Sequence, residues 1–299
     1  MVNLVVTGSV ALDNIKTPFG TAKETLGGAA VYSSVAASFF ARPGIVSVVG
    51  EDFPEEHIEL LKKRNISLEG LKIMPGKTFR WDGYYEYDMN QAHTLNTELN
   101  VFERFIPEIP EQYRKSKYLY LANIHPELQE QVLQEMTPKL VGIDTMNLWI
   151  EQRRKKLLEV IKQCNILFIN DAEARELFST TNLITAGKKI IDMGLHAAVI
   201  KKGEHGSLLF TDGKIFAAPG YPLENIVDPT GAGDTFAGGV MGYLAKTDDS
   251  SDDNLRKAII YGSSLASYDV EDFSLKKLMN ISIEDIEKRY DLFKDIIKF

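Results

Sequence analysis

The chain has 299 residues, of which 44% are hydrophobic and 25% are charged. This balance is typical of a globular protein and excludes a disordered or fibrous chain. The formal net charge of −8 argues against a broad basic surface, so we expect no nucleic-acid partner, although a local basic cleft around a phosphate group is compatible with this charge.

The first residues, Met1 to Ser9, contain no basic region, no long apolar stretch and no small-residue cleavage site. No later segment has the roughly 18 to 20 continuous apolar residues of a membrane helix. The single cysteine, Cys164, excludes an internal disulfide and a multi-cysteine metal site, and it points to a reducing compartment. We therefore expect a soluble, cytoplasmic protein with no membrane partner.

Short apolar runs rich in β-branched residues alternate with amphipathic stretches along the chain. The runs predict buried strands and the stretches predict helices. The predicted strands are Leu4–Val6, Ile45–Val49, Tyr118–Leu121, Leu140–Ile143, Ile166–Ile169 and Ala197–Ile200. The predicted helices are Ala29–Phe40, Glu55–Arg64, Leu128–Met136, Arg153–Gln163 and Ala172–Phe178. This alternation predicts one α/β sandwich, in which helices cover both faces of a parallel sheet.

The segment from about residue 71 to residue 105 interrupts this alternation. Its stretch from Thr78 to Tyr87 is rich in aromatic residues and lacks helical spacing, as in a hairpin or small sheet. With part of residues 11–25, it is expected to form a small β-sheet within a single domain over residues 1–299. A lid or association surface is favoured over a satellite sheet, because long insertions are usually functional. Paired lids would make a homodimer, since twofold dimers are the commonest oligomers.

The C-terminal part, from Asn254 onward, is predicted to be mostly helical, with Lys257–Tyr268 and Ile283–Lys298 as the clearest periods. The acidic run Asp248–Asp253 before it is interpreted as a solvated loop.

The most informative segment is Asp228-Pro229-Thr230-Gly231-Ala232-Gly233-Asp234-Thr235-Phe236-Ala237-Gly238-Gly239. It predicts a glycine-bearing turn at a helix start, where free N–H groups and the helix dipole favour an anion. Asp234, in the first helical turn, is expected to be ionised at neutral pH and able to accept a proton. An anion site beside a base is the equipment of phosphoryl transfer to a hydroxyl. A simple helix cap is the alternative for the short Gly-x-Gly-Asp part.

Two other phosphate-binding motifs are excluded. Gly76-Lys77-Thr78 ends like a P-loop, but position 71, where that motif needs glycine, is Leu71. A dinucleotide fingerprint starting at Gly231 would have its third glycine at position 236, which is Phe236.

The whole Asp228–Gly239 segment closely resembles the signature of the PfkB carbohydrate kinases, the ribokinase-like family. Four further elements resemble family motifs in the expected order: Gly27-Gly28, Gly50-Glu51-Asp52, Asn170-Asp171-Ala172-Glu173 and Lys202-Gly203-Glu204-His205-Gly206. The resemblance covers essentially the whole chain. It implies a ribokinase-like three-layer α/β/α sandwich with a central, mainly parallel sheet and a small β-sheet lid. It also implies ATP-dependent phosphoryl transfer to a sugar-like polyol.

The resemblance implies a role for each motif. Asp234 would be the general base, and the N–H groups of Gly231, Ala232 and Gly233 would form the anion hole. On the nucleotide side, Asn170 and Glu173 would arrange Mg²⁺, its waters and the ATP phosphates, while Lys202, Gly203 and Gly206 would line the nucleotide. Asp228 and Thr230 match positions that hold a monovalent cation such as K⁺ in some members.

The residues themselves leave alternatives open for several of these roles. The spacing of Asn170 and Glu173 is also that of a capping box. A hairpin turn before Ser207 explains the glycines at 203 and 206, and Asp228 could simply stabilise its turn.

Substrate-binding residues are expected near the N-terminus and after the strand Tyr118–Leu121. Asp13 matches the family's carboxylate for substrate hydroxyls, and a carboxylate accepts several such bonds. The remaining candidates are Gly27, Gly28, Tyr32, Asn123, His125 and, on the lid, Arg80.

The identity of the substrate is less determined. Ala11 and Tyr32 stand where ribose kinases usually have asparagines, which argues against ribose itself. The segment Asp144–Trp149 resembles the family's Asp-x-Asn segment without its usual arginine, which weakens the case for an acidic sugar. The alternatives are a nucleoside or inositol kinase of the same fold and a catalytically silent ligand-binding protein.

Overall fold

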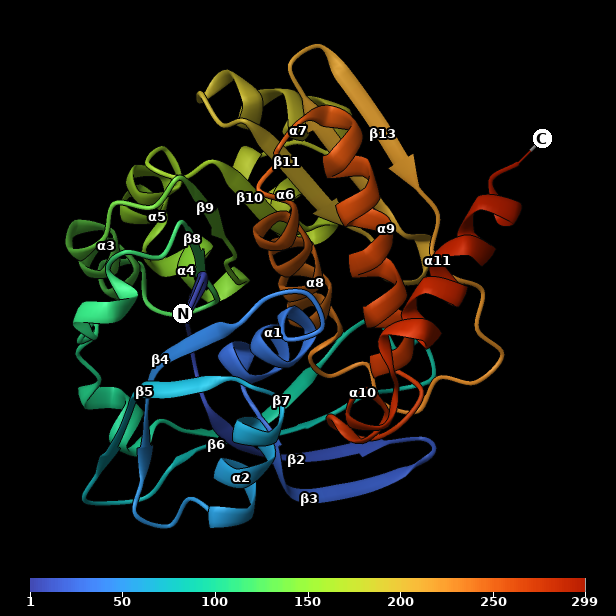
Figure 1. Cartoon of the computed structure of the whole chain (residues 1–299). Helices are drawn as coiled ribbons and strands as arrows, with labels where there is room; N and C mark the ends of the chain where they lie inside the picture. Colours follow the sequence, from blue (N-terminus) through green and yellow to red (C-terminus); the bar gives the residue numbers. More distant parts are fainter. Residues whose placement is uncertain (299) are drawn as a thin grey trace.

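The centre of the molecule is a nine-stranded sheet in the order β13-β12-β11-β10-β9-β8-β1-β4-β5 (Figure 1). In this computed structural model, which describes residues 1–298, every strand pair is parallel except β11–β12 and β12–β13. The strands are β1 (Leu4–Thr7), β4 (Pro43–Gly50), β5 (Ser67–Met74), β8 (Tyr118–Leu121), β9 (Leu140–Ile143), β10 (Ile166–Asn170), β11 (Ala197–Lys201), β12 (Ser207–Thr211) and β13 (Lys214–Ala218).

Helices cover both faces of this sheet, because successive strand residues point to opposite sides. Val5 packs into one core and its neighbours Leu4 and Val6 into the other. The first core contains side chains of α1 (Ala29–Ala37), α2 (Glu55–Lys63), α8 (Ala232–Thr247), α9 (Asp252–Asp269), α10 (Lys276–Asn280) and α11 (Ile283–Ile296). The second contains side chains of α3 (Pro126–Glu135), α4 (Asn147–Gln152), α5 (Arg154–Ile161), α6 (Asp171–Phe178) and α7 (Leu183–Asp192). The predicted three-layer α/β/α sandwich is confirmed.

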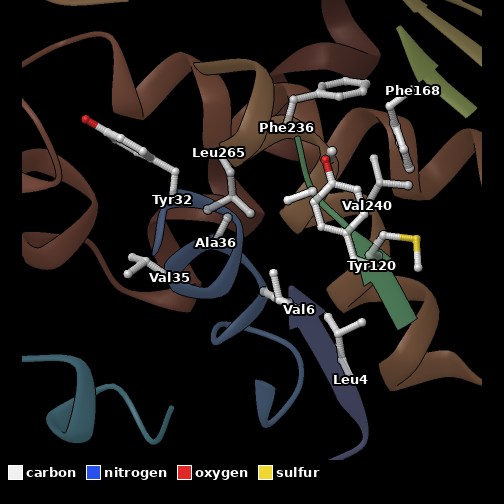
Figure 2. Close-up of a cluster of buried hydrophobic side chains, with 14 of the residues drawn as sticks. Leu4, Val6, Tyr32, Val35, Ala36, Tyr120, Phe168, Phe236, Val240 and Leu265 are labelled. Atoms are coloured by element: carbon white, nitrogen blue, oxygen red, sulfur yellow. The ribbon is translucent and has the colours of Figure 1, made fainter. Parts of the chain in front are cut away.

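Figure 2 shows part of the first core, where Leu4, Val6 and Tyr120 of the sheet meet Phe236 and Val240 of α8. Glycines let α8 approach its neighbours closely. A Cβ on Gly238 would lie 2.2 Å from the carbonyl oxygen of Ser33 in α1. This tight packing holds the first turn of α8 at a defined place above the sheet.

A second, four-stranded sheet has the order β3-β2-β6-β7 and lies along the lower edge in Figure 1. Its strands are β2 (Ala11–Thr17), β3 (Gly20–Gly27), β6 (Phe79–Tyr84) and β7 (His93–Glu98). The small sheet was expected mainly from residues 71–105, but residues 71–74 belong to β5 of the main sheet, and η1 (Asn100–Arg104) is a short 3-10 helix. Residues 11–27 instead contribute two of the four strands.

The acidic run at 248–253 is not simply a solvated loop. Asp248 is the C-cap of α8, and its carboxylate accepts bonds from Lys117, Tyr118 and Lys139, each at 2.8 Å. The run then ends inside α9, whose first residue is Asp252.

Two other short 3-10 turns are η2 (Glu111–Tyr113) and η3 (Gly203–His205). Within residues 1–298, no helix has the length and apolar character required to cross a bilayer.

Candidate active site

Polar side chains gather where three neighbouring parallel strands end. Asp144 directly follows β9, Asn170 ends β10 and Lys201 ends β11. In open α/β sheets this edge is where ligands bind. The Lys201 ammonium donates to Asp144 Oδ2 at 2.5 Å, so this pair bridges the end of the intervening strand. Asn170 was a predicted site residue. Lys201 and Asp144 were not among the predicted site residues. Lys201 could have been found, because it directly follows the strand predicted at 197–200.

Asn170 and Glu173 form the capping box that their spacing allows. The Asn170 side chain accepts from the Glu173 N–H at 2.8 Å, and Glu173 Oε2 accepts from the Asn170 N–H at 2.9 Å. Burial raises the pKa of Glu173 to about 7, and the positive charge of Lys201 opposes that rise. One oxygen of Glu173 therefore serves the helix start, beside the charges of Lys201 and Asp144.

The signature segment forms the predicted turn into α8. Gly231 is the N-cap, with φ +81°, a left-handed conformation that glycine adopts without strain. The Ala232 N–H donates to the Pro229 carbonyl at 3.2 Å, so one of the three predicted anion-hole donors already serves the turn. The N–H of Gly233 lies in the first turn, where a helix provides no internal acceptor.

Asp234 lies in the first turn of α8, and its environment differs from the expectation. Burial and the charge of Asp144, opposed by the charge of Lys201, raise the pKa of Asp234 to about 7. The expectation that Asp234 is fully ionised at neutral pH was wrong, because loss of hydration and the charge of Asp144 both disfavour the charged carboxylate. A carboxyl with a pKa near the working pH is well matched to proton transfer.

Tyr32, a predicted substrate-binding residue, lies instead in the core of the protein. The side chain is 1% exposed and belongs to the core cluster in Figure 2. A Cβ on Gly231 would lie 2.4 Å from this ring. Tyr32 therefore packs against the turn that leads into α8.

Asp13 lies on β2 and is 4% exposed. Burial, together with the charges of Asp228 and Asp234, raises the pKa of Asp13 to about 8, so these three carboxyls are close enough to interact. The backbone N–H of Gly28 donates to Asp13 and opposes the rise. A Cβ on Gly27 would lie 1.9 Å from Asp13 Oδ2, so the absence of a side chain at Gly27 makes room for this carboxyl.

Arg80 is held by carboxylates of the protein itself, which corrects its expected reach over the site. Its guanidinium pairs with Glu24 of β3 at 2.9 Å and with Asp52 at 2.8 Å. Asp52 also accepts from the Thr78 hydroxyl at 2.7 Å. Arg80 thus fastens β6 to β3 and to the turn after β4.

Asn123 and His125 are also engaged elsewhere than expected. Asn123 Oδ1 accepts from Trp149 Nε1 at 2.9 Å, and the His125 ring packs edge-on against Trp149 at 4.8 Å between centroids. His125 additionally pairs with Glu127. These contacts join the end of β8 to α4, and they give no support to a substrate role.

Asp228 and Thr230 stabilise the turn before α8. Asp228 Oδ1 accepts from the Thr230 N–H at 2.9 Å, and Oδ2 accepts from the Ser274 N–H at 3.0 Å. The Thr230 hydroxyl donates to the hydroxyl of Tyr85, just after β6, at 3.2 Å. The turn is therefore connected directly to the small sheet.

A cavity of about 340 Å³ lies between the strand ends and α8. Its lining includes the predicted Asn170, Gly203, Gly206, Ala232 and Gly233, together with the unpredicted Lys201. Lys202 instead contributes its main chain, because its N–H donates to the Gly206 carbonyl at 2.8 Å in the turn between β11 and β12. The β6–β7 connection reaches the same cavity, where Asn90 Nδ2 donates to Glu204 Oε1 at 3.4 Å.

The small sheet places Trp81, one of the aromatic residues of the predicted lid segment, beside Asp13. Trp81 of β6 is the register partner of Asp13 in a parallel pair, so both side chains share one face. Trp81 packs against the cluster of Ile15, Tyr85 and Met89, and Ile226 and Phe273 of the main body pack against the same cluster, so this face is directed toward the body. A Cβ on Gly83 would lie 2.2 Å from the Trp81 ring, which therefore rests on a bare stretch of backbone.

No group of three or more His, Cys, Asp or Glu side chains within residues 1–298 could hold a metal ion. The described residues therefore do not form a metal site made of protein ligands alone. Single carboxylates such as Glu173 fit an ion such as Mg²⁺, which keeps most of its waters and binds one carboxylate and substrate phosphates.

Comparisons with known proteins agree with this geometry. A family model described as pfkB family carbohydrate kinase matches residues 2–279. The cytidine kinase of Thermococcus kodakarensis is 34% identical over 252 residues, covering 81% of this chain and 89% of that protein.

Two solved structures share the fold over almost the whole chain. The nucleoside kinase of Methanocaldococcus jannaschii, an archaeal member of the ribokinase family, has a TM-score of 0.78 at 21% identity, covering 97% of this chain and 98% of that chain. The nucleoside kinase of Burkholderia thailandensis, in complex with ADP-inosine, has a TM-score of 0.77 at 16% identity, covering 97% and 95%. At these identities the likeness concerns the fold alone.

Proposed function

The chain belongs to the pfkB family of carbohydrate kinases, and from this we propose that it transfers the γ-phosphoryl group of ATP to a hydroxyl of a nucleoside. A free sugar or other polyol is the alternative acceptor. The observation that carries the proposal is the juxtaposition of Asp13 and Trp81 on the body-facing side of the small sheet. A carboxyl group exchanges hydrogen bonds with ribose hydroxyls in either protonation state, and an indole ring stacks on a base. The names of the relatives support the same class.

In this proposal, Asp234 takes the proton of the acceptor hydroxyl as its oxygen attacks the γ-phosphorus. The N–H groups at the start of α8 stabilise the charge on the transferred group. The small sheet covers the acceptor, and exclusion of water protects the phosphoryl group from hydrolysis.

Mg²⁺ would be held chiefly by the ATP phosphates and by water bound to Glu173, with Asn170 beside it. When bound, Mg²⁺ neutralises phosphate charge. A K⁺ ion at Asp228 and Thr230 is a further proposal. Asp269 supports it, because this carboxyl is 1% exposed and neither of its oxygens has a hydrogen-bond partner within 3.5 Å among the described residues. Burial and then the charge of Asp228 raise the pKa of Asp269, while the nearby Thr235 hydroxyl opposes the rise.

The test of this function is ADP release from Mg-ATP across a panel of nucleosides, pentoses, hexoses, inositols and sugar acids, with Asp234→Ala as the control. We expect turnover on a nucleoside that the control abolishes. Turnover on a free sugar alone would overturn the nucleoside assignment, and ATP binding without turnover would favour a silent binding protein.

Trp81 should distinguish nucleosides from free sugars. Stacking on an aromatic side chain is worth about 1 to 3 kcal/mol per base. We therefore expect Trp81→Ala to raise the KM for the nucleoside by about tenfold or more, while Trp81→Phe keeps most of the affinity. Steady-state kinetics with a free pentose would provide the comparison. Equal losses for the nucleoside and the pentose would argue against a base-stacking role.

The small sheet is also proposed to join two copies of the chain. Its edge strand β7 is largely exposed, and Phe19 and Leu95 expose 59% and 67% of their surface. Unpaired edge strands with apolar side chains are templates for association. Sedimentation should give a dimer for the native chain and a monomer for Leu95→Glu. Leu292→Glu on α11, where Leu292 is 48% exposed, is the matched control and should leave the dimer intact. A monomeric native chain would contradict the proposal.

A further inference from the structure

The Lys201–Asp144 pair lies across the end of β10, next to the start of α8. The Lys201 ammonium bonds Asp144 Oδ2 at 2.5 Å, and the two side chains are 18% and 3% exposed. The pair is therefore largely withdrawn from water, where an ion pair is far stronger than at an exposed surface. A charge in such a place needs a function or a compensating partner, because burial of ions is costly.

Asp144 is held firmly by its own neighbours. Its Oδ1 accepts from the Thr145 N–H at 2.9 Å, and its Oδ2 accepts from the Tyr120 hydroxyl at 3.2 Å. Both oxygens are thus engaged before any ligand is considered. Asp144 is suited to orienting Lys201, and it has little capacity left to bind a substrate.

Lys201 is directed at the catalytic turn. Its Nζ lies 3.3 Å from the point where a Cβ on Gly233 would stand. An ammonium has three N–H donors, and one of them serves Asp144, so two remain. Among the described residues that line the 340 Å³ cavity, Lys201 is the cationic one. The absence of a side chain at Gly233 leaves room between the ammonium and the helix start.

We propose that Lys201 binds a non-bridging oxygen of the phosphoryl group during its transfer, and that Asp144 is the residue that positions it. The inference rests on the proposed function and adds a catalytic residue to it. The acceptor oxygen forms a bond to the γ-phosphorus while the bond to the β–γ bridging oxygen breaks, and that electron pair leaves with ADP. The acceptor proton goes to Asp234. Lys201 keeps its proton throughout and contributes only its charge and hydrogen bonds.

Binding measurements test this contact without an acceptor substrate. Calorimetry should compare ADP with an ATP analogue whose β–γ bridge is an imido group. For Lys201→Met we expect at least a tenfold loss of analogue affinity and less than a threefold change for ADP. Lys201→Arg should retain most of the analogue affinity. Lys214→Met, a lysine on β13 that pairs with Asp252 at the surface, is the control and should match the native chain.

Removal of Lys201 leaves Asp144 buried without its partner, so the single variant could fail to fold. The double variant Lys201→Met/Asp144→Asn removes both charges and should preserve the fold while showing the same selective loss. Equal loss of ADP and the analogue, or no loss of either, in a folded variant would overturn the inference. If the native chain bound both ligands but phosphorylated no acceptor, the proposed function would fail, while the selective loss would still support the contact.

The pH dependence of kcat distinguishes a catalytic role of Lys201 from a purely structural one. The charged groups facing Lys201 are Asp144 after β9, Glu173 on α6 and Asp234 on α8. With the acceptor identified by the panel, Lys201→Met should lower kcat by at least a hundredfold. As the pH is lowered, the residual kcat of Lys201→Met should begin to fall at a higher pH than the kcat of the native chain. The kcat of Asp144→Asn should begin to fall at a lower pH than that of the native chain. The same pH dependence in the native chain and both variants would argue against an interaction with the reacting groups.

Discussion

Replacing Asp234 with asparagine is expected to lower kcat by about a thousandfold, because general-base catalysis typically contributes about 10² to 10⁴ in rate. The amide keeps the shape of the carboxyl but cannot take the proton of the acceptor hydroxyl. The affinity for ATP should change little, since the N–H groups at the start of α8 are unaltered. Steady-state kinetics and calorimetry on the same preparation measure the two quantities separately.

The pH dependence of the native chain gives the same base a second signature. Burial raises the pKa of Asp234 to about 7. The base is inactive when protonated, so kcat/KM should fall as the pH is lowered through about 7 and should level off above it. This limb should be absent from the residual activity of Asp234→Asn. A variant that keeps native turnover while remaining folded and ATP-bound would eliminate Asp234 as the base.

Replacing Gly231 with alanine is expected to damage both stability and catalysis. An L-residue in the left-handed region costs about 1 to 2 kcal/mol, and overpacking typically adds about 1 to 3 kcal/mol. Both penalties apply here, because φ is +81° and the new Cβ would lie 2.4 Å from the Tyr32 ring. A displaced turn also moves the base, and a misplacement of about 1 Å can cost a hundredfold in rate.

Gly213 supplies the matched control for this variant. Its φ is +68°, but a Cβ there would meet no atom within 4 Å. Gly213→Ala should therefore lose only about 1 to 2 kcal/mol from the backbone conformation and should keep full activity. Urea unfolding and kcat should be measured for both variants. Equal behaviour of the two would mean that the contact between Gly231 and Tyr32 has no importance.

The sheet could be predicted where strands are buried on both faces. The runs at 118–121 and 140–143 carry apolar residues throughout, and the structure has strands with those same bounds. The small sheet was harder to predict. In β2, polar Asp13 is buried, so alternation of apolar and polar residues does not identify its inner face. β7 is almost wholly exposed and carries little apolar signal.

The turn that carries Asp234 was predictable because a run of twelve residues has a distinctive composition. The properties that depend on neighbours distant in sequence were not. The raised pKa of Asp234 comes from burial and from Asp144. The roles of Tyr32, Arg80 and Asn123 depend on Gly231, Glu24 and Trp149, respectively. The cavity lysine is Lys201 rather than Lys202, and the side-chain direction at a strand end decides between them.

The parallel pairing of β2 with β6 constrains how the chain can fold. Between these two strands the sequence contains β3, α1, β4, α2 and β5, so elements of the main body supply the crossover that parallel partners need. A lone β2–β3 hairpin is marginally stable in water. Pairing β2 with β6 closes a long loop, and the entropy lost in this closure must be offset by contacts that form afterwards. The small sheet must therefore form late. During synthesis, β2 and β3 cannot pair with β6 until β6 has emerged, so the small sheet is completed only after the part of the main body encoded between β3 and β6 has been synthesised.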